Sequence, residues 1–136
     1  MGFLDKTITK AKATAKTTSN KYNESKDARQ IQSQIKAEKD KVKECYETIG
    51  KEYYRFTVDG DESHKDCFDG LVDQINESRK AIEDLEAQLE ELRVNAKMER
   101  DDIKATHDAK IQEIEANDAA AKAEKERLKK ENDDLF

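Results

Sequence analysis

Between residues 68 and 92, apolar residues and one serine recur at alternating steps of three and four, and this repeat limits the possible fold more than any other feature. The repeat consists of Phe68, Leu71, Ile75, Ser78, Ile82, Leu85, Leu89 and Leu92. Such a pattern over more than three heptads places one narrow apolar stripe along a helix, as in a coiled coil. Charged residues make up 43% of the chain and proline is absent, which favours long helices over a compact globule. Disorder is the rival interpretation of this composition, and the regular repeat favours ordered helices.

A second stripe precedes the first, over residues 27–56. It is followed by the polar stretch "TVDGDES", in which Gly60 can adopt a positive φ and end the first helix. Two arms of similar length joined by a short polar turn favour an antiparallel hairpin. The predicted fold is all-α: an antiparallel helical hairpin over residues 27–95, with its turn at 57–62 and its centre near residue 60. The predicted hairpin seam consists of Ile35, Val42, Ile49, Tyr53, Phe56, Phe68, Leu71, Ile75, Ile82, Leu85 and Leu89.

Residues 1–26 form a basic leader, with six lysines against two acids. At 100° per residue, Leu4, Ile8 and Tyr22 fall on one face of a helix, and most of the lysines lie away from it. This arrangement predicts an amphipathic N-terminal helix that forms when its apolar face is covered. The residues expected to contact a membrane or a protein partner are Phe3, Leu4, Ile8, Lys6, Lys10, Lys12 and Lys16.

The C-terminal segment, residues 96–136, has a weaker repeat. Apolar residues recur every seven positions from Ile114, while the layer between them is mostly polar. The segment can be helical, because Glu and Lys residues lie at helical spacing, but it cannot hold a tight coil alone. We expect a long, exposed, charged helix, either continuous with the second hairpin arm or bent near residues 94–100.

The sequence offers no catalytic, cofactor-binding or metal site. An active site needs reactive groups in a dry pocket, which a two-helix hairpin does not provide, so the aromatic residues near the turn are expected to close the end of the hairpin. His64 and Cys67 lie one turn apart, but two ligands do not make a zinc site. Cys45 and Cys67 are offset by about 12 Å along the hairpin, too far for a disulfide. We therefore expect no enzyme activity and no cofactor.

Three stretches carry a resemblance: "MGFLDK", "YETIGKEYY" and "LVDQINESRKAIEDLEAQLEEL". Together they resemble a group of small, uncharacterised bacterial coiled-coil proteins, which have an amphipathic leader, a helical hairpin and often a C-terminal zinc ribbon. No CxxC pair follows residue 95, so the resemblance implies no zinc ribbon here. The order of leader and hairpin also looks like the phage-shock and ESCRT-III membrane-remodelling family, where an N-terminal amphipathic helix contacts lipid and hairpins stack into polymers. This second likeness is an analogy of architecture.

These features predict a non-enzymatic scaffold that self-associates, because one hairpin covers only one side of each stripe. Two alternatives stay open for the leader: it binds an anionic membrane surface, or it binds protein, either the acidic hairpin of its own kind or an unknown partner. Residues 57–95 carry twelve acids against four bases, which would repel nucleic acid. No apolar run is long enough to span a membrane. The expected location is the cytoplasm, with peripheral contact to the inner membrane face if the leader binds lipid.

Overall fold

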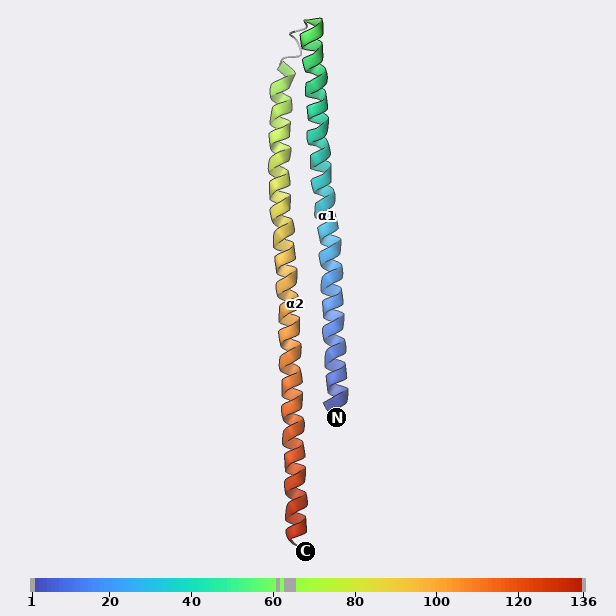
Figure 1. The fold of residues 1–136 in the computed structure, drawn as a ribbon, viewed down its shortest axis with the longest axis vertical. Helices are drawn as coiled ribbons and strands as arrows, with labels where there is room; N and C mark the ends of the chain where they lie inside the picture. Colours follow the sequence, from blue (N-terminus) through green and yellow to red (C-terminus); the bar gives the residue numbers. More distant parts are fainter. Residues whose placement is uncertain (1, 61, 63–65, 136) are drawn as a thin grey trace. The chain divides into compact units, whose positions relative to one another are not determined.

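The structure, a computed structural model, describes residues 2–60, 62 and 66–135. It contains two α-helices, α1 (Gly2–Asp59) and α2 (Asp66–Asp134), and the described residues include no strand. The predicted all-α antiparallel helical hairpin is confirmed (Figure 1). The leader is the first part of α1, and the C-terminal segment is a continuation of α2 without a break near residues 94–100.

The turn begins where Gly60 ends α1. Gly60 has a φ of 68°, the left-handed conformation that glycine adopts without steric cost, as predicted. Its N–H donates to the Phe56 carbonyl over 3.1 Å and so satisfies one carbonyl at the helix end. Helix α1 extends to Asp59, three residues beyond the predicted arm, so residues 57–59 are helical rather than part of the turn. Ser63 and His64 lie outside the described residues.

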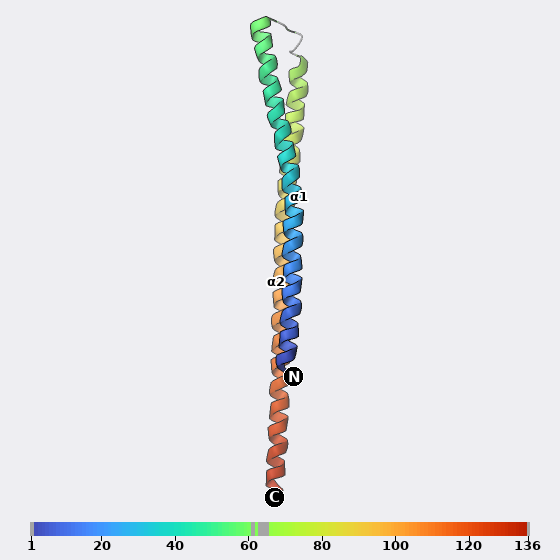
Figure 2. The same cartoon turned by 90° about the vertical axis from the view of Figure 1, so that its right-hand side faces the viewer.

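The chain divides into two units. The hairpin unit is Glu24–Asn95, and the terminal unit combines Met1–Asn23 with Ala96–Phe136. The predicted leader and the predicted C-terminal segment, which are far apart in the sequence, therefore belong to one unit. Within each unit, α1 and α2 lie side by side in two perpendicular views (Figures 1 and 2).

In the hairpin unit, the buried and half-buried residues follow the 3-4 repeat on both helices. Cys45 Sγ lies 3.4 Å from Gln74 Oε1, and Ser78 hydrogen-bonds to Glu38. Both contacts join residues at similar distances from residue 60, so the antiparallel register is the one expected. Nearly all predicted seam residues are buried or half-buried, namely Ile35, Val42, Ile49, Phe56, Phe68, Leu71, Ile75, Ile82, Leu85 and Leu89.

Tyr53 is the exception and corrects the predicted seam. Its side chain is 59% exposed, and Glu52 occupies the inner position instead. Both residues are spaced correctly from Ile49 and Phe56, since steps of three then four and of four then three each fit a heptad. From Ile31 to Ile49 the inward residues of α1 alternate strictly between steps of four and three, and this alternation places Glu52 on the inner side after Ile49. An aromatic residue beside the seam was therefore mistaken for a seam residue.

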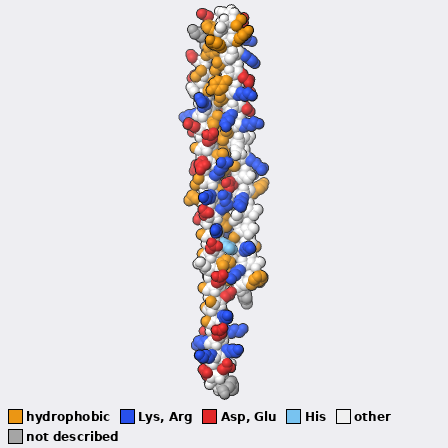
Figure 3. Space-filling view, viewed as in Figure 1, with side chains coloured by type: hydrophobic (Ala, Val, Ile, Leu, Met, Phe, Trp, Pro, Cys, Tyr) orange, Lys and Arg blue, Asp and Glu red, His pale blue; other side chains and the backbone are white. Residues whose placement is uncertain are grey.

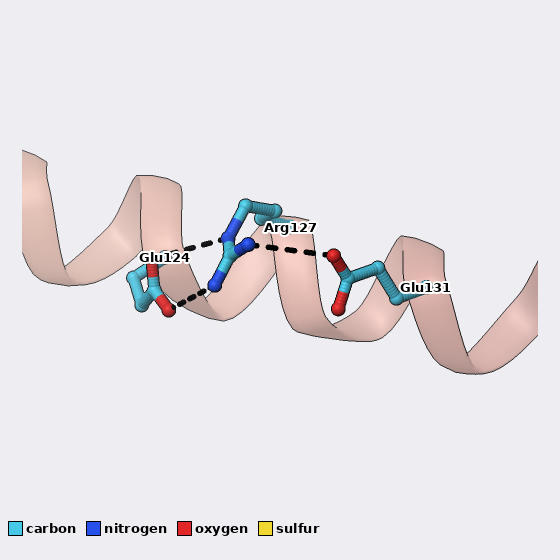
Figure 4. A network of polar contacts seen from close by, with 3 residues as sticks. All are labelled: Glu124, Arg127 and Glu131. Carbon is cyan, nitrogen blue, oxygen red and sulfur yellow. Dashed lines mark hydrogen bonds and ion pairs between the residues drawn. The ribbon is translucent and has the colours of Figure 1, made fainter.

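Beyond Asp118, α2 has no helix beside it within the terminal unit, because α1 begins at Gly2 against the Asp118 side chain. Every described residue after Asp118 is exposed. Ion pairs along the helix surface support this overhang: Arg127 contacts Glu124 through its Nη2 at 2.6 Å and Glu131 through its Nη1 at 3.4 Å (Figure 4). Such pairs each contribute about 0.2–0.5 kcal/mol to an isolated helix.

Candidate interaction surface

The leader packs against α2 through a face that is small and polar. Six positions between residues 2 and 23 are buried or half-buried, and the other residues of this range are exposed. This inner face of the leader consists of Gly2, Lys6, Thr9, Ala13, Thr17 and Asn20. The α2 positions turned inward in the same unit include Ile103, Ile111 and Ile114. The large apolar side chains of this packing therefore come from α2.

Asn20 is the most buried polar residue of this packing, with 5% of its surface exposed. Its Nδ2 donates to the Ala96 carbonyl over 3.2 Å, and its Oδ1 accepts from Arg100 Nη1 over 3.0 Å. A buried amide satisfied from the opposite helix fixes the register between two helices, because any slip leaves it unpaired. Nearer the N-terminus, Lys6 Nζ forms an ion pair with Glu115 at 3.1 Å.

The apolar side of the leader points the other way. Leu4, Ile8 and Tyr22 form the outer apolar face and are 64%, 46% and 67% exposed, and Phe3, which flanks this face, is 85% exposed. At 100° per residue, Leu4 lies about 180° from Ala13 on the inner face. The predicted amphipathic character is therefore real, but the apolar face is not what holds the leader to its own chain.

The lysines of the leader do not all behave alike. Lys10, Lys12 and Lys16 are exposed and make no ion pair within the described residues. Lys6 is on the inner face, and its pairing with Glu115 removes it from the set of free surface cations. Three of the four lysines predicted to contact a partner thus remain exposed, and Lys10 and Lys12 are the ones nearest the apolar residues of the leader.

The hairpin unit carries one perturbed carboxylate. A hydrogen bond from the Ser78 hydroxyl, and a weaker contribution from Lys41, whose Nζ lies 3.1 Å away, lower the pKa of Glu38 below its ordinary value of 4.5. Glu38 is half-buried on the inner side of α1, and Ser78 is the buried serine layer of the predicted repeat. The polar layer is thus satisfied across the two helices and has a structural role.

Metal-ligating side chains do not cluster in the part of the chain that is described. Among residues 2–60, 62 and 66–135, no group of three or more His, Cys, Asp and Glu side chains is placed to hold a metal ion. Cys45 is buried, Cys67 is exposed, and both are free thiols. His64, one of the two metal ligands considered from the sequence, lies outside the described residues.

Sequence reasoning missed the inner face of the leader, and a signal for it was present. Counting backward from Ile31 in steps of three and four reaches Asn20, Ala13, Thr9, Lys6 and Gly2, which continue the phase of the hairpin seam. The apolar periodicity of the leader has a different phase and drew attention to the opposite face.

No protein-family model, curated protein or solved structure matches this chain. The resemblance to small bacterial coiled-coil proteins therefore stays a prediction. Among the described residues, neither helix has a stretch long and apolar enough to cross a membrane.

Proposed function

We propose that this protein is a non-enzymatic coiled-coil scaffold that self-associates and binds anionic membrane surfaces through its leader. The observation that carries the proposal is the outer apolar face, which stays exposed although the leader is packed against α2. Exposed lysines lie beside this face. A helix with an apolar face bordered by lysines is suited to lie in the interface of an anionic bilayer.

The continuity of α1 favours this binding energetically. The leader is already helical within a 58-residue helix, so membrane contact needs no coil-to-helix transition. Ordering a disordered segment would cost about 1–2 kcal/mol per residue before new hydrogen bonds offset it. Phe3, Leu4 and Ile8 each contribute up to about 1.5–3 kcal/mol if fully buried, and less at an interface. Each lysine near an anionic surface adds about 1 kcal/mol.

Self-association is supported by how little of the chain is buried. Among the described residues, no large side chain is less than 2% exposed. The accessible surface is 10917 Å², compared with about 7,300 Å² for a compact monomer of the same mass. Association of several copies would cover part of this excess. It would also bring several leaders to one membrane, which strengthens the weak binding of each.

Co-sedimentation with liposomes tests the membrane contact. We expect the wild-type chain to bind vesicles with an anionic lipid and not neutral vesicles, and we expect binding to weaken with salt. Ile8→Asp should abolish binding. Val94→Asp is the matched control, because Val94 is 45% exposed against 46% for Ile8 but lies in the hairpin unit.

Two results would count against the proposal. Equal loss of vesicle binding in Ile8→Asp and Val94→Asp would show that the outer apolar face is not the contact. If no vesicle binds the wild-type chain and Ile8→Asp instead breaks its oligomer, the leader binds protein. The protein would then be a soluble structural or adaptor coiled coil.

A further inference from the structure

The described part of α1 near the turn exposes a second apolar surface, which the leader does not explain. Tyr46, Tyr53, Tyr54 and Val58 are each more than half exposed. Gly50 lies between them, four residues after Tyr46 and three and four residues before Tyr53 and Tyr54. We call these five residues the tyrosine face. Hydrophobic side chains gather near the turn end of the hairpin unit in Figure 3.

Gly50 is the unusual member of this face. Glycine in the interior of a helix is destabilising relative to alanine, because it loses more conformational freedom on folding. Here φ is ordinary, and a Cβ added at Gly50 would meet nothing within 4 Å. Packing within the chain therefore gives no reason for a glycine at this position. A notch between three exposed aromatic rings does give one, since it lets a second helix approach closely.

We propose that the tyrosine face is the interface through which two copies of this chain associate, with their α1 helices crossing antiparallel at Gly50. The proposal names the contact for the self-association proposed above and rests on it. Two-fold symmetry requires a surface that complements itself. An antiparallel crossing at Gly50 places Tyr46 beside the partner's Tyr53, and by symmetry Tyr53 beside the partner's Tyr46.

The charges at the edge of the face fit the same arrangement. Glu47 and Lys51 are both exposed and lie on the side of α1 occupied by Tyr54. Neither has an ion-pair partner within the described residues. The antiparallel crossing brings Glu47 close to the partner's Lys51, and the symmetry makes this pair twice. A parallel two-fold arrangement would place these charges of the two copies on opposite edges of the contact, where they form no pair.

The size of the face suits a reversible dimer. A tyrosine side chain offers roughly 150–250 Å², so three that are more than half exposed present on the order of 300–400 Å², to which Val58 adds. Two copies would bury roughly 1,000 Å², near the lower limit for specific interfaces and typical of weak, transient ones. The dimer should therefore form in a concentration-dependent way.

Sedimentation velocity of the full chain without lipid, from micromolar to near-millimolar concentration, tests the interface. We expect a monomer–dimer equilibrium whose dissociation constant rises by at least about tenfold in Gly50→Gln, because the side chain fills the notch at the centre of the contact. Gly70→Gln is the matched control: a Cβ at Gly70 also meets nothing within 4 Å. It should leave the equilibrium unchanged. Helicity should not fall in either variant, since glutamine forms helices better than glycine.

Charge reversal supplies a readout that a general loss of stability would not reproduce. Glu47→Lys and Lys51→Glu should each weaken the dimer, and the double variant should restore it. If the wild-type chain dimerises and Gly50→Gln dimerises equally well, the proposed interface is wrong but the proposal of self-association holds. A wild-type chain that stays monomeric would overturn both. If Gly50→Gln lost vesicle binding instead of dimerisation, the face would belong to lipid and the inference would be wrong.

Discussion

Replacing Asn20 by alanine should loosen the terminal unit and leave the hairpin unit intact. The substitution removes the hydrogen bond to the Ala96 carbonyl and the one from Arg100. A neutral hydrogen bond contributes about 1 kcal/mol net, and one to a charged group about 1.5–3 kcal/mol. The expected loss is therefore about 2.5–4 kcal/mol, which is roughly a 60- to 700-fold change in the local opening equilibrium at about 1.4 kcal/mol per tenfold.

Hydrogen exchange measured by mass spectrometry reads this change directly, because amides exchange as their unit opens. Peptides from residues 2–23 should exchange faster in Asn20→Ala by roughly the factor above, or up to the limit set by complete opening. Peptides from the arms of the hairpin unit should not change. Asn23→Ala is the control, because Asn23 is exposed on the same helix. Equal exchange of residues 2–23 in wild type and Asn20→Ala would refute the role of the buried amide.

Three further predictions concern the hairpin unit. The pKa of Glu38 is lower in the folded state, so its stabilising contribution is present above the pKa of the unfolded state and is lost as pH falls through the pKa of the folded state. In denaturant titrations at several pH values, Ser78→Ala should therefore reduce the loss of unfolding free energy at acid pH. Ile75→Ala removes a side chain that is only 6% exposed and should lower the free energy of unfolding by about 2–5 kcal/mol in urea denaturation. Cys67 should react with a thiol reagent before Cys45, and equal rates would contradict the burial of Cys45.

The sequence was sufficient for the fold of the hairpin unit because its apolar repeat and its packing have the same phase. From Phe68 to Leu92, each apolar residue of the repeat is an inward residue in the structure. Gly60 could also be assigned, since a helix that ends in a tight turn requires a residue tolerant of positive φ. The assignment of Tyr53 was wrong because it followed the apolar residue, whereas the alternation of steps along the α1 arm of the hairpin unit places Glu52 inward.

In the terminal unit the sequence was a poorer guide for a physical reason. Burial of small and polar residues such as Thr9 and Ala13 leaves no hydrophobic signature, whereas the exposed Leu4 and Ile8 leave a clear one. Periodicity analysis follows apolar side chains and so reported the outer face. The α2 residues that pack against the leader could be found only by extending the register of the hairpin seam along both helices.

The separation of these two faces bears on how the proposed membrane contact would work. A leader with a single apolar stripe would have to leave α2 before that stripe could enter a bilayer, so membrane binding and the terminal unit would compete. Here the inner face, held by Asn20 and Lys6, lies about 180° from the outer apolar face. Both contacts can therefore be made at once, and a bound leader can stay attached to the scaffold. Membrane binding should then leave the slow hydrogen exchange of residues 2–23 intact or slow it further. Faster exchange on vesicles would show that the leader leaves α2 in order to bind.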